Sequence, residues 1–320
     1  MNSQDSVVVA CAANAAYALP MAVMLRSAAE NLAPGRRLDA WIVDDGLGDD
    51  LRRRISESLP DNAKVNWLAP SRSDFDGVPL IGGMPITTYD KVTIAELLPH
   101  HVRKVIWLDC DMLVLADLTE LWENPLGNHH ALAVIDALVG TVSSRFGIRR
   151  YAELGLDGSK PYFNAGMLVI DPAKWRDASV AGEAIKYLKT FRKSVFFWDQ
   201  EALNVVLARK WAEIDSRWNW SATLYRIPAR NGAPPDNGIK RDRIVHFNGN
   251  IKPWLVRESW HLDSIYYDVL DRTAWKGWRP SASLARSILA WYGSSRIRRV
   301  AYPAEQWGMH AVWLLRQRNA

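Results

Sequence analysis

Short apolar runs alternate with amphipathic segments over the first 215 residues of the chain. Most positions in these runs are apolar, which is typical of strands that are buried on both faces of a sheet. They predict strands at residues 7–12, 38–43, 65–68, 105–108, 131–135 and 163–170, and a later apolar run predicts one more strand at 244–247. The segments between them predict helices at residues 20–32, 49–59, 88–98, 180–191 and 199–207. Strands that alternate with helices indicate an α/β fold, with a mostly parallel sheet and helices on both faces.

An uncharged run of nineteen residues, from Val7 to Leu25, is long enough to raise the question of a membrane span or a signal sequence. We reject both interpretations. Asp5 precedes the run without any Lys or Arg, whereas a signal peptide carries positive charge there. Asn14 and Pro20 interrupt the run where a strand would turn into a helix.

Composition places the chain among ordinary globular proteins, because 48% of its residues are hydrophobic and 23% are charged. These fractions exclude a disordered, collagen-like or disulfide-scaffold protein. Its two cysteines, Cys11 and Cys110, have no metal-ligand spacing. We expect no disulfide and a reduced, cytoplasmic location.

Positive charge is concentrated at the end of the chain. Residues 272–320 hold nine Lys or Arg and one acid, Glu305, together with five of the sixteen tryptophans. We therefore predict a catalytic domain over residues 1–271 and a basic, Trp-rich tail over 272–320, with helices at 284–292 and 303–316. Such helices suit an anionic membrane surface at the inner face of the membrane. The alternative is that they pack on the catalytic domain, and no nucleic acid partner is expected.

Two aspartates follow the apolar run at residues 105–108 directly, in the order Asp109-Cys110-Asp111. Alternate residues of an extended strand share a face, so both carboxylates can point at one hard cation. A bare Asp-x-Asp often marks only a solvated loop. At the end of a buried strand, however, it lies where such sheets bind ligands. We therefore predict that Asp109 and Asp111 are metal ligands.

His246 ends the last predicted strand and begins the sequence His-Phe-Asn-Gly-Asn-Ile-Lys-Pro-Trp. A single histidine after a strand is commonly a packed side chain. Here Gly249 allows close backbone approach to a ligand, and Lys252 supplies a point charge that suits phosphate. A histidine with two aspartates is an acceptable ligand set for Mn²⁺. The pattern thus predicts a shared metal and diphosphate site.

Three further polar clusters have simple structural interpretations when each is taken alone. Residues 162–166, Tyr-Phe-Asn-Ala-Gly, fit a β-bulge or a strand start. Asp199, at the start of the segment 199–204, fits a helix N-cap. Lys91 fits a solvated helix residue. None of the three clusters by itself indicates a site.

In order and content, however, these clusters together resemble glycosyltransferase family 8, the retaining transferases that include bacterial lipooligosaccharide galactosyltransferases and glycogenin. The resemblance covers residues 7 to about 254 and is carried by residues 11–17, 86–89, 108–114, 162–166, 199–204 and 246–254. It implies a GT-A-type nucleotide-diphospho-sugar transferase domain, a UDP-sugar donor, and Mn²⁺ or Mg²⁺ as the metal.

The resemblance also implies roles for single residues around the diphosphate. Asp109, Asp111 and His246 match the metal ligands. Gly249 and Lys252 match contacts to the diphosphate.

Around the rest of the donor, Tyr17 matches the aromatic residue that stacks on uracil, and Asn14 lies in the same nucleotide loop. The residues that match positions holding the donor sugar are Lys91, Asp136, Asn164, Ala165 and Asp199, with Lys91 standing where Arg is more usual. Gln200 matches the residue beside the anomeric carbon, on the face opposite the departing diphosphate.

The nucleotide loop departs from the family pattern. The family typically has Asp-x-Asn-Tyr, whereas this chain has Asn14-Ala15-Ala16-Tyr17. Asn14 still accepts a hydrogen bond, but Ala16 cannot replace a polar contact to the nucleoside. Losing this contact costs about 1 kcal/mol of binding free energy, which a nucleotide site can tolerate. A base other than uracil is the alternative.

Breaking a sugar–diphosphate bond develops negative charge, which a metal and Lys252 would neutralise. Gln200 is an amide and a poor nucleophile, so we expect a front-face displacement, with Asp199 as the alternative covalent nucleophile. The predicted reaction moves galactose or glucose to a glycan or lipid-linked acceptor such as lipopolysaccharide core.

Two other functions stay open. One is a nucleotidyl or phosphoryl transferase that uses Asp109 and Asp111 for its metal, although the chain lacks a GxxxxGK[ST] loop. The other is a nucleotide-sugar-binding protein whose catalytic site has decayed.

Overall fold

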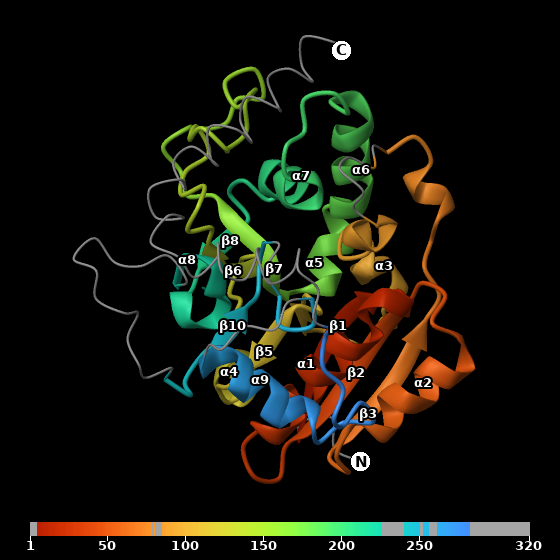
Figure 1. Ribbon diagram of the computed structural model, residues 1–320. Coiled ribbons are helices and arrows are strands. Elements are labelled where there is room, and N and C mark those ends of the chain that lie inside the picture. Colours follow the sequence, from red (N-terminus) through yellow and green to blue (C-terminus); the bar gives the residue numbers. More distant parts are fainter. Residues whose placement is uncertain are drawn as a thin grey trace, which may run out of the picture.

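The computed structural model describes residues 5–78, 80, 85–225, 240–249, 252–255 and 261–281. Its main sheet has the strand order β3-β2-β1-β4-β7-β6-β8 (Figure 1). These strands are β1 (Ser6–Ala13), β2 (Arg37–Asp44), β3 (Ala63–Leu68), β4 (Val105–Leu108), β6 (Ala131–Ile135), β7 (Phe163–Ile170) and β8 (Trp211–Glu213). Strand β7 runs antiparallel to both of its neighbours, and the other pairs are parallel. The predicted mostly parallel α/β sheet is therefore confirmed.

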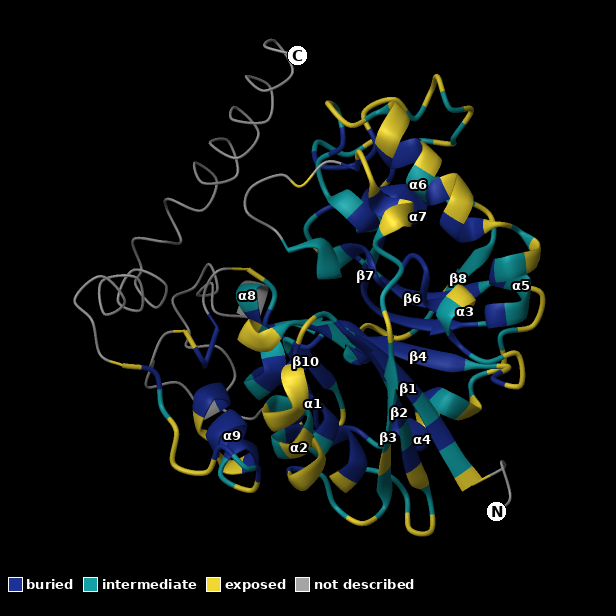
Figure 2. Ribbon diagram, turned by 90° about the vertical axis from the view of Figure 1, so that its right-hand side faces the viewer, coloured by how far each residue is buried: buried dark blue, intermediate teal, exposed yellow. Residues whose placement is uncertain are grey.

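Helices cover both faces of this sheet (Figure 2). One face packs against α1 (Ala18–Glu30), α2 (Gly48–Glu57) and α9 (His261–Leu270). The other packs against α3 (Ile94–Leu97), α5 (Pro172–Asp177), α6 (Val180–Thr190) and α7 (Trp198–Val206). Alternation along β1 separates the two cores, because Val9 and Cys11 join the first and Ala10 joins the second.

The uncharged run at residues 7–25 forms β1, a 3₁₀ turn (Ala15–Tyr17) and the first part of α1. In the part of the chain that the structure describes, no helix is both long enough and apolar enough to cross a membrane.

A second, smaller sheet consists of β5 (Met112–Val114), β10 (Ile244–His246) and β9 (Trp220–Ser221). Strand β10 lies between the other two and pairs antiparallel with β5 and parallel with β9. In this register His246 lies opposite Met112. The pairing therefore brings His246, from late in the chain, beside the residue that follows Asp111.

Two strand ends meet at the point where the strand order reverses. The chain moves outward from β1 to β2 and β3, and then returns to β4 on the other side of β1. In such folds ligands bind at this switch point, beyond the carboxyl ends of the strands. Asn14 follows β1 and Asp109 follows β4 there. The reversed strand β7 starts at the same place, and the Asp109 N–H donates to the carbonyl oxygen of Gly166 over 2.8 Å.

Residues 136–162, between β6 and β7, form an excursion with its own small hydrophobic core. The core consists of Val139, Val142, Phe146, Ile148 and Tyr162. The two ends are joined by a hydrogen bond from the Asp136 N–H to the Tyr162 carbonyl oxygen, 2.8 Å long. The excursion thus leaves and rejoins the sheet at one place.

The helix predicted at residues 88–98 is wrong. The chain forms a 3₁₀ turn (Ile86–Tyr89), an irregular segment, and only then the short helix α3. The side chains of Asp90 and Lys91 are buried between these elements and pair with Arg72 and Asp109 respectively. Burying two charged groups beside fixed partners outweighs the helical pattern of the sequence.

The first ten residues of the predicted tail, 272–281, pack on the α/β core. Trp275 is buried, and the Ala274 N–H donates to Ser58 Oγ at the end of α2 over 3.0 Å. Arg272 pairs with Glu30 of α1 at 2.6 Å. The helices predicted at 284–292 and 303–316 lie outside the described residues, and the division at residue 271 stays a prediction.

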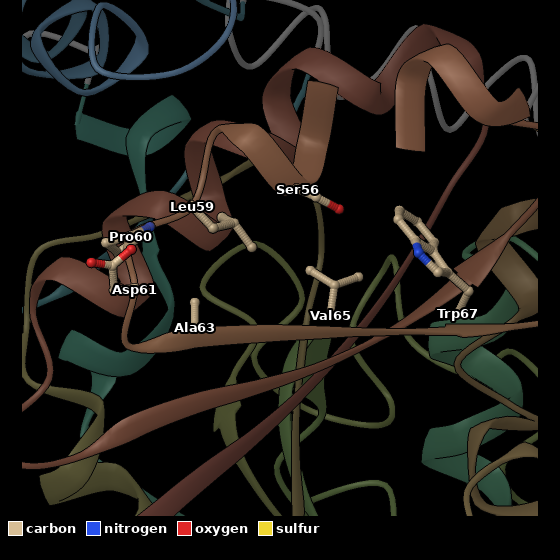
Figure 3. Close-up of a pocket in the computed structure, with 7 residues that line it drawn as sticks. All are labelled: Ser56, Leu59, Pro60, Asp61, Ala63, Val65 and Trp67. Atoms are coloured by element: carbon tan, nitrogen blue, oxygen red, sulfur yellow. The ribbon is translucent and has the colours of Figure 1, made fainter. Parts of the chain in front are cut away.

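An open hollow of about 430 Å³ lies at the outer edge of the sheet, between β3 and the end of α2 (Figure 3). It is lined by Ser56, Leu59, Pro60, Asp61, Ala63, Val65 and Trp67. None of the predicted site residues lines it.

Candidate active site

The three predicted metal ligands come together. Asp109 follows β4, Asp111 precedes β5 and His246 ends β10, and one ligand atom of each lies within 4.8 Å of the others. Two carboxylates and an imidazole suit Mn²⁺, and the carboxylates also suit Mg²⁺. The ligand atoms present therefore fit the metal that the sequence predicts.

Asp111 lies between two nitrogen groups. Its Oδ1 is 3.2 Å from His246 Nε2, and its Oδ2 is 2.5 Å from the Lys252 ammonium. Burial on its own would raise the pKa of Asp111, but Lys252 and His246 outweigh burial and hold that pKa below its usual range. Asp111 is therefore an anion at neutral pH. Lys252 also donates to the Phe247 carbonyl oxygen over 2.8 Å, which fixes its position.

Lys91 is a buried cation between two acids. Its Nζ is 2.9 Å from Asp109 Oδ1 and 3.0 Å from Asp199 Oδ2, and it donates to the Ala165 carbonyl oxygen over 3.2 Å. Burial favours the neutral amine, but the two carboxylates outweigh it and raise the pKa of Lys91. Burial also raises the pKa of Asp199, and Lys91 opposes this by stabilising the anion. Lys91 therefore links the metal cluster to the start of α7.

Trp107 is a site residue that the sequence analysis missed. Its indole N–H donates to Asp109 Oδ1 over 2.8 Å, and the Lys91 ammonium lies 5.8 Å from the ring centroid. Its position in the sequence indicated this role, because Trp107 lies two residues before Asp109 and residues two apart on a strand share a face. Trp107 orients the carboxylate of Asp109.

Asp136, Asn164 and Gln200 form one hydrogen-bonded group. Asp136 Oδ2 accepts from Asn164 Nδ2 at 2.8 Å and from Gln200 Nε2 at 3.0 Å. Gln200 Oε1 in turn accepts from the Ala165 N–H at 3.1 Å. These residues were predicted to surround the donor sugar, and the structure brings them together. A small cavity of about 50 Å³ adjoins them, lined by Ile135, Asp136, Ala137, Leu138, Asn164, Asn219, Ser221, Thr223 and Asn248.

The turn before Asp199 and Gln200 is strained. Trp198, the first residue of α7, has φ of 37°, which is left-handed backbone that a bulky residue rarely adopts. This turn allows Asp199 to reach Lys91 while Gln200 reaches Asp136. Unfavourable backbone of this kind persists where surrounding contacts fix it, and it is common at functional sites.

On the predicted nucleotide side, Tyr17 lies beside the metal cluster. Its ring is 6.2 Å from Trp254 in an edge-to-face arrangement. Burial, with the nearby charge of Asp111, raises its pKa, so the phenol stays neutral. Asn14 Oδ1 accepts from the Ala16 N–H over 3.1 Å and so caps the 3₁₀ turn that presents Tyr17. The structural role of Asn14 in this loop was not predicted.

Gly249 has φ of 93°, and a Cβ there would lie 3.0 Å from Thr223 Oγ1. The position therefore favours glycine on two counts, backbone conformation and space.

Cys110, between the two aspartates, is buried and donates its S–H to the Ala12 carbonyl oxygen over 3.1 Å. Cys11 and Cys110 are both free thiols.

Glu201, beside the candidate site, is expected to make the free energy of unfolding depend on pH. It accepts from Tyr187 Oη and from the Phe196 N–H, both at 2.7 Å, and burial raises its pKa from 4.5 to about 7. A pKa raised on folding gives stability that is complete below about pH 4.5 and is lost as pH rises through 7. Relative to a Glu201→Gln variant, we expect the free energy of unfolding to fall by about 2 kcal/mol between pH 5 and pH 8.

Urea unfolding of both proteins at the two pH values measures this difference. Comparing the two proteins cancels the contributions of other buried acids to the pH dependence. One such acid is Asp90, because burial raises its pKa to about 6 despite the nearby Arg72. Parallel pH curves for the two proteins would show that Glu201 is not the titrating group.

The comparisons with known proteins agree with this geometry. Residues 8–258 match the model of the family described as glycosyl transferase family 8. The chain belongs to glycosyl transferase family 8. The matched range includes most of β1, the metal cluster, α7 and Lys252, so it contains every residue of the candidate site.

Two curated relatives cover most of this family 8 chain. General stress protein A of Bacillus subtilis is 25% identical over 269 residues, which are 81% of this chain and 91% of that protein. Lipopolysaccharide 1,2-glucosyltransferase of Escherichia coli is 22% identical over 258 residues, 79% of this chain and 73% of that protein.

Among solved structures, the galactosyltransferase LgtC in complex with donor and acceptor sugar analogs superposes with a TM-score of 0.70. It is 23% identical, and the match covers 90% of this chain and 100% of that one. The fold is therefore the GT-A fold, and this family 8 protein is a glycosyltransferase. Family membership implies a nucleotide-sugar donor and a glycan acceptor.

Proposed function

We propose that the chain transfers a hexose, galactose or glucose, from a UDP-sugar to a glycan or lipid-linked acceptor such as lipopolysaccharide core, with retention of configuration. One observation carries the proposal. Asp109, Asp111 and His246 cluster beside Lys252 at the switch point of an α/β sheet. The names of two similar proteins, a lipopolysaccharide glucosyltransferase and a galactosyltransferase, support a hexose.

Asp109, Asp111 and His246 would hold Mn²⁺ or Mg²⁺. The ion would act as a Lewis acid that neutralises charge on the departing diphosphate. Lys252, which lies against Asp111, adds a fixed positive charge on the same side. Gly249 would let the backbone approach the diphosphate, and Tyr17 would stack on the base with Asn14 holding its loop.

Asp136, Asn164, Ala165 and Lys91 would hold the hydroxyl groups of the sugar. The small cavity beside Asp136 and Asn164 supports this assignment. Asp136 is buried and its side chain already accepts from two amide groups, so its orientation is fixed before a donor binds.

A front-face displacement suits the residues around the reacting carbon. The bond from the anomeric carbon to the phosphate oxygen breaks, and the acceptor oxygen bonds to the same face of that carbon. The acceptor hydroxyl proton passes to the departing diphosphate. Asp199 is a weaker candidate for a covalent nucleophile because Lys91 holds its carboxylate in an ion pair of 3.0 Å. Gln200 would stabilise positive charge on the sugar through its amide oxygen.

Donor hydrolysis tests the proposed function. We expect release of free nucleoside diphosphate from one UDP-hexose, with Mn²⁺ and without any acceptor, and no release from GDP- or ADP-sugars. Release without metal, or from an ADP-sugar only, would contradict the donor and metal assignments. If no donor is hydrolysed, calorimetry with UDP and Mn²⁺ distinguishes an enzyme that requires its acceptor from a chain with no nucleotide site.

Docking of residues 272–320 on an anionic membrane surface stays a prediction. The charge of this segment supports it, and residues 272–281 would hold it to α1 and α2. Sedimentation of the full chain with anionic but not with zwitterionic vesicles is the expected result. If the chain sediments with neither kind of vesicle, the result would favour packing of this segment on the catalytic domain.

A further inference from the structure

Asn219 is a buried amide that joins the metal cluster to the predicted sugar site. It ends a 3₁₀ turn (Ser216–Asn219) and precedes β9. Its Oδ1 lies 2.9 Å from Nδ1 of His246, and its Nδ2 donates to Asn164 Oδ1 over 2.8 Å. Sequence reasoning gave it no role, because it lies in an irregular segment 27 residues before His246.

The direction of these hydrogen bonds is fixed at one end by the backbone. The Gly166 N–H can only donate, and it points at the Asn164 side chain over 2.9 Å. The atom that receives it is therefore Asn164 Oδ1, which leaves Asn164 Nδ2 to face the Asp136 carboxylate at 2.8 Å. A carboxylate can only accept, so both contacts require the same orientation of Asn164.

The same logic passes through Asn219 to the histidine. Asn164 Oδ1 needs a donor on its Asn219 side, which must be Nδ2. The oxygen of Asn219 then faces His246, and Nδ1 of the ring must carry a proton to donate to it. Its other nitrogen, Nε2, is the one that faces Asp111 at 3.2 Å.

We infer that Asn219 is a positioning residue that holds the proton of His246 on Nδ1 and so keeps Nε2 available to the metal. This inference rests on the metal site of the proposed function. Without Asn219, the Asp111 carboxylate would favour the opposite tautomer, with the proton on Nε2. A metal would then have to displace that proton before it could bind.

Gly166 supports the arrangement in a second way. A Cβ at residue 166 would lie 2.4 Å from His246 Cε1, so the ring packs directly on the glycine backbone. The residue whose N–H sets the hydrogen-bond direction is thus also the one that leaves space for the ring. Ring plane and tautomer are fixed from the same strand, β7.

Mn²⁺ titration followed by the electron paramagnetic resonance signal of free Mn²⁺ tests this inference without turnover. For Asn219→Ala we expect Mn²⁺ affinity to fall by about 10- to 100-fold, the usual effect of losing a residue that orients a metal-binding histidine. Asn219→Asp keeps the acceptor for Nδ1 and should retain most of the affinity. Asn66→Ala, at a half-buried asparagine of β3 bonded to Asp39, is the matched control and should bind as the native chain does.

Nitrogen-15 spectra of His246 provide a second readout, and its measurement on the native chain needs no substituted protein. In the native chain without metal, we expect Nδ1 to be the protonated nitrogen of the neutral ring. In Asn219→Ala without metal, we expect the neutral ring to carry its proton on Nε2. The second measurement still decides the matter if the alanine variant does not fold, because a native ring protonated only on Nε2 would overturn the inference.

The outcomes separate this inference from the proposed function. Native binding of Mn²⁺ and UDP without transfer of any sugar would contradict the function and leave Asn219 in its role. Equal Mn²⁺ affinity of the native chain and Asn219→Ala would contradict the role of Asn219 and leave the function. Absence of Mn²⁺ binding by the native chain would overturn both.

Discussion

Replacing Asp111 with asparagine is expected to reduce metal-dependent donor hydrolysis by roughly 10³-fold, which corresponds to about 4 kcal/mol of transition-state stabilisation. Asp111 has a charge that burial opposes and that Lys252 and His246 maintain. The amide has nearly the same shape but no charge, so it is a poor ligand for a hard cation. It also leaves Lys252 without its 2.5 Å ion-pair partner.

Mn²⁺ binding and urea unfolding must be measured on the same variant, because loss of the ion pair also lowers stability. Asp61→Asn, at an exposed aspartate just before β3, is the matched control. It should leave donor hydrolysis, Mn²⁺ binding and the free energy of unfolding unchanged. Undiminished hydrolysis by folded Asp111→Asn would remove Asp111 from the metal site.

Replacing Lys91 with methionine is expected to destabilise the folded chain by about 3 kcal/mol at pH 8, because breaking one member of a buried ion-pair group leaves uncompensated charge. Lys91 is buried between Asp109 and Asp199. Burial already raises the pKa of Asp199, and loss of the cation would raise it further. Stability held by a raised pKa is complete at low pH and lost as pH rises, so the destabilisation should be smaller at pH 5.

Urea unfolding at the two pH values measures this effect. Lys91→Arg keeps the charge, and we expect it to restore most of the stability. Lys64→Met, at an exposed lysine of β3, controls for the loss of a lysine in general and should change stability little. Equal unfolding free energies for Lys91→Met and the native chain at pH 8 would show that the two acids do not need Lys91.

Much of the fold could be predicted because its central strands β4, β6 and β7 are buried on both faces and therefore form nearly continuous apolar runs. The run before Asp109 is the clearest case, since a buried strand that ends in two acids indicates both an element and a site. The helix at 88–98 failed for the opposite reason. There the helical pattern includes Asp90 and Lys91, whose buried partners come from residues 72, 109 and 199, and no local pattern reveals such distant partners.

In the candidate site, too, residues in local sequence patterns could be predicted and residues that depend on distant partners could not. Residues that lie in short motifs, such as Asp111, His246 and Gln200, could be singled out from the chain. Trp107 and Asn219 lie outside those motifs, and each acts only through another side chain. Asn219 in particular depends on the register of the small sheet, where β10 lies between β9 and β5. That register becomes visible only when the strands are paired.

The excursion between β6 and β7 has a consequence for how this scaffold can change. Its ends meet at the hydrogen bond between residues 136 and 162, and its buried apolar side chains pack on one another and on Phe196, Phe197 and Val205. Insertions, deletions or a transplanted segment between these two anchors would leave the pairing of β6 with β7 unaltered. The chain thus has a segment, beside the residues proposed to bind the sugar, whose length and sequence can change without altering the sheet.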